Sequence, residues 1–251
     1  MSVEPEGSPS PAERPAPILI ATGVTKVYRT NALEVPALRG IDLTIERGQF
    51  LAVMGPSGSG KTTLLNCLSG LDDIDAGSVT VDGADIHAMP DAKRTAHRAR
   101  SMGFIFQSFN LIPVLSAAEN VELPLLLTGE KPGRARERAQ RMLERIGLSH
   151  RHDHRPSELS GGEQQRVAVA RALVGEPAIV WADEPTGNLD SQMAASVLDL
   201  LREVHDAGQT IVVVTHDAQI GGASRRLVRM QDGLIVADGE PTEVLEGLSV
   251  R

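Results

Sequence analysis

The glycine-rich segment GPSGSGKT, at residues 55–62, restricts the possible folds of this chain more than any other feature. The short apolar run QFLAVM stands directly before it, and the segment Thr62–Leu68 after it has the composition of a helix. A buried strand, a glycine-rich turn and a helix in this order are the context in which such a segment wraps phosphate groups. The sequence therefore predicts an α/β fold built around a phosphate-binding loop, or P-loop.

Composition limits what the rest of the chain can be. It has 251 residues, of which 41% are hydrophobic but only 2% aromatic, so we expect one large α/β domain with an aliphatic core. The formal net charge of -8 argues against an extended nucleic-acid surface, and we expect no nucleic acid partner. The single cysteine, Cys67, excludes an internal disulfide and a cysteine-rich metal site.

The beginning of the chain differs in texture from the remainder. Residues 1–17 are proline-rich and acidic, which predicts a disordered leader, and we assign residues 18–251 to one domain. No stretch approaches the roughly 18 consecutive apolar residues of a membrane span. We therefore expect no direct membrane insertion and a cytoplasmic location.

Apolar segments on either side of a charged region predict the layout of the domain. Ile18–Tyr28 is expected to be a strand that pairs with Leu43–Ile45 in an N-terminal antiparallel β subdomain. Ala178–Ala182 and Thr210–Val214 are expected to be parallel strands joined by a helix. Charged helical stretches at about 90–157 predict an inserted α-helical lobe. The expected fold class is thus α/β, a P-loop NTPase core with a mixed sheet, an antiparallel β subdomain and this lobe.

The P-loop offers backbone amides and a lysine to a nucleotide. Lys61 is expected to contact the β- and γ-phosphate oxygens and to act in catalysis, and the Thr62 hydroxyl is expected to bind Mg²⁺. The residues expected to hold the nucleotide at this loop are Gly55, Pro56, Ser57, Gly58, Ser59, Gly60, Lys61, Thr62 and Thr63.

Two carboxylates end a predicted strand in VWADEP, at residues 180–185. Asp183 can hold Mg²⁺ through its water shell, and Glu184 is placed to deprotonate a water that attacks the γ-phosphate. His216 follows another predicted strand in VTHD, where it can hydrogen-bond the γ-phosphate and position that base. These residues predict a phosphoryl transfer from nucleotide to water.

A second glycine-rich element, LSGGEQQR at residues 159–166, predicts the start of a helix. Ser160 can cap it, and the amides of Gly161 and Gly162 present a partial positive charge that attracts a γ-phosphate. The P-loop of the same chain already has its own lysine and amides. We therefore expect this helix end to serve a nucleotide bound to another subunit.

These motifs and their order resemble the nucleotide-binding subunit of an ABC transporter, over nearly everything after the leader. The resemblance implies ATP and Mg²⁺ as cofactors and a head-to-tail dimer, expected to be a homodimer. ATP then lies between the P-loop of one copy and the LSGGEQQR segment, called the signature, of the other. It also implies that Tyr28 stacks on adenine and that Gln107 senses Mg²⁺ and contacts the membrane partner. Gln164 and Asp190 are implied to belong to the ATP site at the dimer interface, where Asp190 touches the opposite subunit.

Three longer segments, VPALRGIDLTIERG, GFIFQSFNLIPVLSAAENVELPL and ADEPTGNLD, resemble the group of lipoprotein-releasing (LolD) and macrolide-export (MacB) ATPases, with a cell-division member as a further relative. The resemblance implies a separate permease of FtsX/MacB-like architecture and a peripheral place on the inner face of the cell membrane. A non-transporting regulator acting on a cell-division-like permease stays open as an alternative. The inserted lobe is too short and lacks the cysteines for a DNA-repair or chromosome-organising ATPase.

Three further features have simpler interpretations. The acidic segment LDDIDAG, at residues 71–77, lacks the alternating ligand spacing and closing glutamate of a calcium loop. The histidines of HRHDH, at residues 150–154, are expected to lie in a solvated loop. Basic clusters near residues 93–100 and 134–141 are expected to be solvated helix faces, with anionic headgroups near the permease as the alternative.

Overall fold

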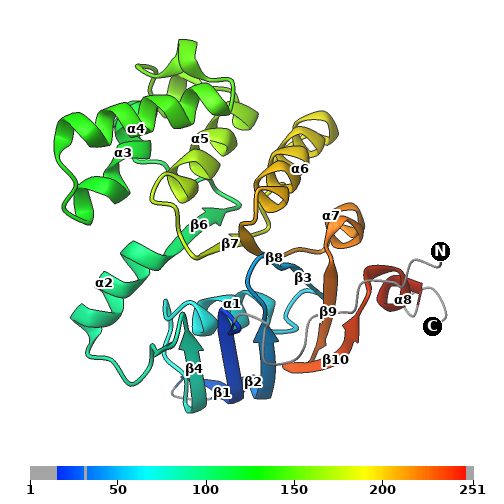
Figure 1. The fold of residues 1–251 in the computed structure, drawn as a ribbon. Coiled ribbons are helices and arrows are strands. Elements are labelled where there is room, and N and C mark those ends of the chain that lie inside the picture. Colours follow the sequence, from blue (N-terminus) through cyan, green and yellow to red (C-terminus); the bar gives the residue numbers. More distant parts are fainter. Residues whose placement is uncertain (1–15, 31–32, 247–251) are drawn as a thin grey trace, which may run out of the picture.

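The computed structural model describes residues 16–30 and 33–246, and the predicted leader lies outside this part except for its last two residues. Two β-sheets form the body of the molecule, and helices pack on both faces of the larger one (Figure 1). In sheet order the larger sheet consists of β10 (Leu234–Gly239), β9 (Arg226–Gln231), β3 (Phe50–Met54), β8 (Thr210–Val214), β7 (Ile179–Asp183) and β6 (Met102–Phe106).

The larger sheet is mixed, as the sequence predicts. Strands β9, β3, β8, β7 and β6 run parallel, and β10 joins β9 as an antiparallel hairpin. Every residue of β3 and β8 is buried, because both faces of the parallel part are covered. This burial explains why the two strands are continuous apolar runs in the sequence rather than alternating ones.

A second sheet, entirely antiparallel, holds the N-terminal region, which confirms the predicted β subdomain. We expected only Leu43–Ile45 to pair with the first strand, with VPALRG as a connection. The ladder instead runs from Leu19 opposite Ile45 to the far ends of both strands, and VPALRG lies inside the second strand. The first half of that strand is exposed, so no apolar alternation marked it. The strands are β2 (Leu33–Ile45), β1 (Leu19–Thr30), β4 (Ala76–Val81) and β5 (Ala84–Asp85).

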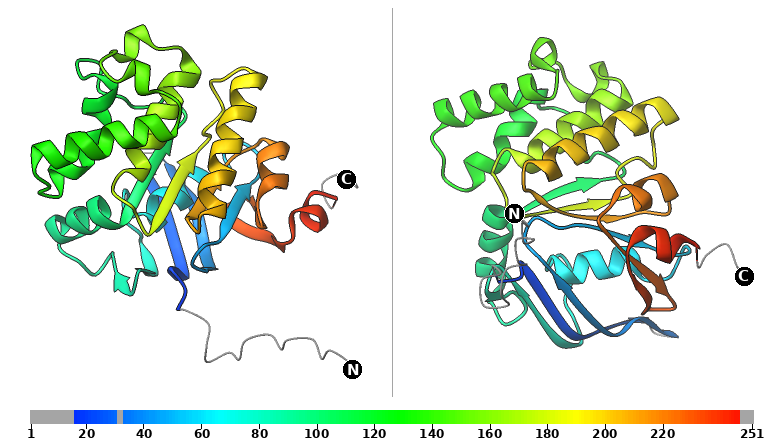
Figure 2. Two further views of the ribbon diagram at one scale, coloured as in Figure 1. Left: turned by 45° about the horizontal axis from the view of Figure 1, so that its top comes forward. Right: turned by 45° about the vertical axis from the view of Figure 1, so that its right-hand side comes forward.

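Helix α1 (Lys61–Leu68) lies between the two sheets, as the right-hand view of Figure 2 shows. Its Leu64 and Leu65 belong to one core with Leu51 of β3 and Leu19 of β1. Each buried leucine contributes about 1.5–3 kcal/mol by leaving water. Because α1 begins at the P-loop, this packing fixes the loop relative to both sheets.

The opposite face of the larger sheet is covered by two longer helices. Phe50 of β3 points to this face, whereas its neighbour Leu51 points to α1, because successive side chains of a strand alternate. Phe50 packs in a common core with Val169 and Leu201 from the two helices. These helices are α5 (Gly161–Leu173) and α6 (Ser191–Asp206).

The helical lobe is built from two helices and the outer side of α5. Ala135, Ala139 and Leu143 are fully buried in its core, on the helix face that the sequence predicts. The expected extent of the lobe, about 90–157, is wrong in one respect, because Met102–Phe106 forms β6 at the edge of the larger sheet. A charged helix directly precedes this short apolar run, so the sequence pattern did not indicate a strand there. The two lobe helices are α3 (Ala117–Leu127) and α4 (Pro132–Arg145), and the charged helix before β6 is α2 (Asp91–Ser101).

Four short helices complete the described chain. None of the helices within residues 16–30 and 33–246 is long and apolar enough to cross a membrane. The short helices are η2 (Ser149–Arg151), η3 (Pro156–Glu158), α7 (Ala218–Ala223) and α8 (Pro241–Glu246).

Candidate nucleotide-binding site

The P-loop connects β3 to α1, and its last glycine is the N-cap of the helix. Gly60 has a left-handed φ of 98°, and a Cβ atom there would lie 2.5 Å from the carbonyl oxygen of Ala37 in β2. Only glycine tolerates both conditions. The antiparallel sheet and the P-loop are thus in direct backbone contact, so the sheet helps to set the shape of the loop.

Lys61 lies folded across the loop that it follows. Its Nζ donates hydrogen bonds to the carbonyl oxygens of Gly55 and Pro56, each at 2.9 Å, and the residue is only 9% exposed. An ammonium group held in this way carries its charge at the centre of the loop. Phosphate oxygens arriving at the loop would therefore meet a positive charge that is already in position.

A cavity of about 720 Å³ opens above the P-loop. Most of the loop lines it, together with Tyr28 from β1 and with Glu184 and His216 from the ends of two strands of the larger sheet. Residues that are far apart in the sequence therefore surround one space. Its size is in the range of pockets that hold drug-sized ligands.

Asp183 ends β7 beside the first turn of α1. Its Oδ1 accepts a hydrogen bond from the Thr62 hydroxyl at 3.2 Å. Burial raises the pKa of Asp183 above its ordinary value; the Thr62 hydroxyl opposes this rise and the neighbouring Glu184 carboxylate adds to it. A hydroxyl and a carboxylate side by side are oxygen ligands of the kind that Mg²⁺ prefers, so the donor set fits that ion.

Glu184 has an unusual backbone conformation, and both oxygens of its carboxylate have hydrogen-bond partners. Its φ of 46° is in the left-handed region, which costs a residue other than glycine about 1–3 kcal/mol. Its Oε1 lies 2.9 Å from Nδ1 of His216, and its Oε2 accepts from the Thr215 hydroxyl at 3.2 Å. The backbone thus turns this carboxylate away from the strand and toward the cavity. Sequence reasoning missed Thr215, although it lies inside the VTHD segment that indicated His216.

The second glycine-rich element starts α5, as predicted. Ser160 is the N-cap: its Oγ accepts from the amide of Glu163 at 3.3 Å, and a Glu163 carboxylate oxygen accepts from the Ser160 amide at 2.8 Å. Arg151 donates to the same carboxylate at 3.1 Å. A Cβ atom at Gly162 would lie 3.1 Å from the Met193 side chain, so α5 and α6 meet closely at this glycine.

The remaining expected site residues do not line the cavity above the P-loop. Gln107 and Asn188 exchange hydrogen bonds, from Gln107 Nε2 to Asn188 Oδ1 at 3.3 Å and from Asn188 Nδ2 to the Gln107 carbonyl at 3.0 Å. Gln164 donates to the Leu159 carbonyl. Asp190 caps α6 by accepting from an amide at 2.9 Å. Ser160, Gly161 and Gly162 are also absent from the walls of this cavity.

A comparison with protein families identifies this arrangement. A family model described as ABC transporter matches residues 38–187, more than half of the chain. This chain belongs to the ABC transporter family. The matched region of this ABC cassette begins in β2 and ends three residues after Glu184.

Individual relatives agree with the family assignment. The lipoprotein-releasing system ATP-binding protein LolD of Saccharophagus degradans is 45% identical over 89% of this chain and 99% of its own length. The macrolide export ATP-binding/permease protein MacB of Marinobacter nauticus is 44% identical over 89% of this chain, which spans only 35% of that protein. The predicted resemblance to LolD and MacB is confirmed.

Solved structures confirm the predicted fold class. A dimeric structure of the ATP-binding cassette MJ0796, bound to ADP and Pi, is 39% identical and superposes with a TM-score of 0.82. The superposition covers 89% of this chain and 98% of the other. A second dimeric structure of the same bacterial ABC transporter cassette matches equally well.

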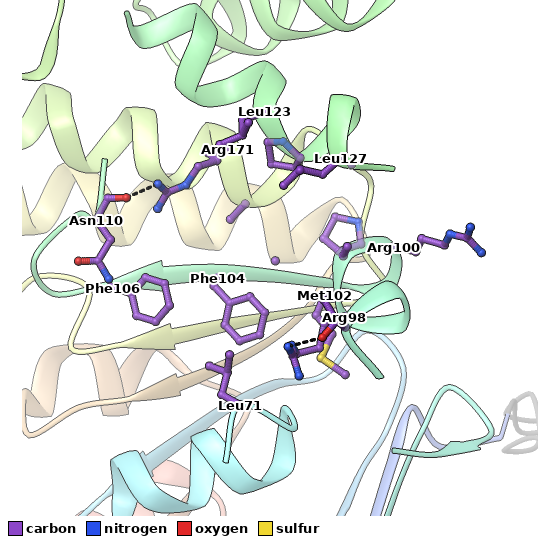
Figure 3. Close-up of a pocket in the computed structure, with 17 residues that line it drawn as sticks. Leu71, Arg98, Arg100, Met102, Phe104, Phe106, Asn110, Leu123, Leu127 and Arg171 are labelled. Atoms are coloured by element: carbon purple, nitrogen blue, oxygen red, sulfur yellow. Dashed lines mark hydrogen bonds between the residues drawn. The ribbon is translucent and has the colours of Figure 1, made fainter. Parts of the chain in front are cut away.

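This ABC cassette has a second cavity, of about 370 Å³, beside the edge strand β6 (Figure 3). Phe104 and Phe106 line it with stacked rings, whose centroids are 6.0 Å apart. Leu127 adds apolar surface and is 72% exposed. Arg171 is tied to the carbonyl oxygens of residues 109 and 110, whereas Arg100 is exposed at the same cavity. The walls are therefore mainly apolar with a positive edge.

Proposed function

We propose that this chain is the ATP-binding subunit of an ABC transporter, and that it hydrolyses ATP at the interface of two cassettes to drive a membrane permease. One observation carries the proposal: Tyr28, the P-loop, Glu184 and His216 surround a single cavity although they are far apart in the sequence. An aromatic ring, a loop of amides with a lysine, and a carboxylate in contact with a histidine match the base, phosphates and attacking water of ATP hydrolysis.

In this proposal Glu184 takes the proton from the attacking water, and its neighbours hold it for that task. His216 and the Thr215 hydroxyl each contact one carboxylate oxygen, so the carboxylate has little freedom to rotate. A general base contributes about 10²–10⁴-fold when it is placed within hydrogen-bond reach of its proton. Lys61 balances the charge of the phosphate oxygens.

Mg²⁺ belongs to the proposal because the oxygen atoms of Thr62 and Asp183 lie side by side, and Thr62 lines the cavity. The ion, when bound, neutralises phosphate charge. Gln107 was expected to join this set. In the structure Gln107 instead contacts Asn188. We therefore propose that the Gln107 side chain joins the edge of the metal site only part of the time, rather than permanently.

The dimer belongs to the proposal because the cavity lacks the signature residues. Ser160, Gly161 and Gly162 present a capped helix end that the P-loop of the same chain does not use. In a head-to-tail homodimer this helix end faces the γ-phosphate held by the other copy, and Asp190 lies at the contact. Both solved structures of the related cassette MJ0796 are dimeric.

The permease is proposed to be a separate chain of FtsX/MacB-like architecture, which holds this subunit on the inner face of the membrane. The MacB relative is named as an ATP-binding and permease protein in one chain, and this chain spans only its cassette-sized third. We propose that the cavity beside β6 receives a short apolar permease segment whose carboxylate pairs with Arg100. No feature of the described residues favours the non-transporting regulator.

Replacing the proposed base tests the proposal. We expect Glu184→Gln to lower the rate of ATP hydrolysis about 10²–10⁴-fold while ATP binding persists. Light scattering after gel filtration should then show an ATP-dependent dimer of the variant. Glu243→Gln, at an exposed glutamate of α8, is the matched control and should behave like the parent. Hydrolysis by Glu184→Gln at the parental rate would exclude Glu184 as the base.

A further inference from the structure

The acidic segment at residues 71–77 has no role in the site described so far. It connects α1 to β4 and lies against β1, the strand that carries Tyr28. Its three aspartates contact different partners, although they are almost adjacent in the sequence. Asp72 contacts Tyr28, Asp73 contacts Arg94 of α2, and Asp75 contacts the backbone of β1.

Asp72 holds the ring of Tyr28 through its hydroxyl group. The hydroxyl donates to Oδ2 of Asp72 at 2.8 Å, and Nζ of Lys26 donates to Oδ1 at 2.7 Å. The same ammonium group lies 5.1 Å from the centroid of the tyrosine ring. One carboxylate therefore joins a cation and an aromatic ring that stand two residues apart on β1.

Asp75 fixes the strand on which the ring stands. Its Oδ2 accepts from the amide of Val27 at 2.5 Å, and its own amide donates to the carbonyl of Thr25 at 2.9 Å. These contacts replace strand pairing where β1 leaves its partner β4 at Thr25. The backbone on the N-terminal side of Tyr28 is thus held by the acidic segment.

The charge on Asp72 persists at neutral pH. Partial burial would raise its pKa, but the hydrogen bonds from Lys26 and Tyr28 outweigh burial and lower the pKa below its ordinary value. Lys26 balances this charge, so the carboxylate stands close to the nucleotide cavity without an unpaired negative charge beside the phosphates.

We propose that Asp72 is a positioning residue that holds the Tyr28 ring in the orientation needed to stack on the adenine base. The proposal rests on the proposed function, in which Tyr28 faces the base. The ring is 40% exposed at the wall of the cavity, so packing alone restrains it weakly. A ring fixed before the nucleotide arrives loses less conformational freedom on binding, and ATP affinity rises accordingly.

Variants of the full chain, with two probes that differ only in the base and sugar, test this proposal. We expect Asp72→Ala to weaken ATP binding about three- to tenfold, the effect of one lost hydrogen bond, and to leave binding of inorganic triphosphate unchanged. Tyr28→Phe keeps the ring but removes this hydrogen bond together with the contact between the tyrosine hydroxyl and the Thr63 side chain, so it should weaken ATP binding at least as much. The double variant should be no weaker than Tyr28→Phe alone.

Asp73→Ala is the matched control, because its carboxylate lies in the same segment but pairs with Arg94. We expect its ATP affinity to equal that of the parent. The proposal is overturned if Asp72→Ala leaves ATP affinity unchanged, or if it weakens ATP and triphosphate equally, which would indicate a general disturbance of the fold. A parental chain that binds triphosphate but shows no preference for ATP would instead contradict the proposed function.

Discussion

The two halves of the proposed ATP site differ in how well their own groups are satisfied. In the P-loop half, the hydroxyl of Ser59 is buried without a hydrogen-bond partner among the described residues. Asp183 is buried enough to raise its pKa, and Glu184 has a left-handed backbone. Each of these features destabilises the nucleotide-free fold, and each lies in or beside the loop and strand end that face the cavity.

At the helix end of the signature half the capping groups are satisfied, and the one buried side-chain oxygen of this segment without a hydrogen-bond partner among the described residues, Oε1 of Gln165, lies further along α5. Ser160 and Glu163 satisfy each other in a capping box, and Arg151 neutralises the glutamate. Asp190 caps the next helix. These side chains form their hydrogen bonds within the chain. A ligand could therefore bind only to the positively polarised N-terminal end of the helix.

The difference indicates which half is built around the ligand. Unfavourable local structure persists when function requires it, and it concentrates at binding and catalytic sites. The P-loop half is therefore interpreted as the half that receives the nucleotide within one chain. The signature half is a stable helix terminus, which is interpreted as binding the nucleotide held by the P-loop of a second chain.

The largest expected effect comes from placing a charge on the signature half. A Cβ atom at Gly161 would make only ordinary contacts, at 3.6 Å and 3.8 Å, and a carboxylate at a helix N-terminus is favourable. We therefore expect Gly161→Asp to keep or raise the melting temperature while it lowers ATP hydrolysis about 10²–10³-fold by repelling the phosphate. Gly161→Asn, of the same size without the charge, is the control and should lose far less activity.

Mixing two inactive variants sharpens the same comparison. A dimer of one Lys61→Ala copy and one Gly161→Asp copy contains one site in which both halves are intact. Random pairing should therefore restore hydrolysis to about a quarter of the parental rate. Failure of the mixture to exceed either variant alone would show that the two halves do not come from different chains.

A stability gain is expected in the P-loop half. Folding raises the pKa of Asp183, so the folded chain holds this proton to a higher pH than the unfolded chain. Stability is then lost as the pH rises from the ordinary aspartate value through the raised one, and the cost is complete above it. Asp183→Asn removes the charge and should raise the denaturation midpoint at pH about 7, with the gain disappearing toward pH about 4.

Denaturant titrations of the nucleotide-free chain at both pH values provide the measurement. Hydrolysis by the same variant should be lost, because the proposed metal site then lacks its carboxylate. A variant less stable than the parent at neutral pH would contradict the idea that this half carries an unfavourable charge.

The smallest expected effect concerns the cap of α6. Asp190→Ala removes the hydrogen bond to the Met193 amide and should cost about 1 kcal/mol of unfolding free energy. Asp190→Asn keeps a capping oxygen and should leave stability unchanged. We expect hydrolysis to fall in both variants, because the proposed contact with the other subunit needs the charge. Full activity of Asp190→Asn would show that Asp190 acts only as a helix cap.

Local patterns in the sequence were sufficient for the elements that bind phosphate. The apolar run before GPSGSGKT predicted β3, and Ser160 with Glu163 three residues later has the spacing of a helix start. Such features depend on a few consecutive residues. The edge strand β6 was missed because a charged helix directly precedes its five residues, and the early part of β2 was missed because it is exposed.

Contacts between distant segments could not be predicted from the sequence. No sequence pattern connects Thr215 to Glu184, or Asn188 to Gln107, because each pair meets only when separate strands and loops pack together. The same holds for Asp72 and Tyr28, which lie 44 positions apart.

The sequence by itself determined the P-loop, the two carboxylates after β7 and the capped glycine pair, because each is a local arrangement of backbone and neighbouring side chains. Only the tertiary structure decided which of these residues share a cavity. The parallel strands bring Glu184 and His216 to the P-loop, whereas the sheet and lobe leave Ser160 outside the walls of that cavity. Packing of α1 between the two sheets is the physical reason, since it fixes the loop against β1, β2 and β7.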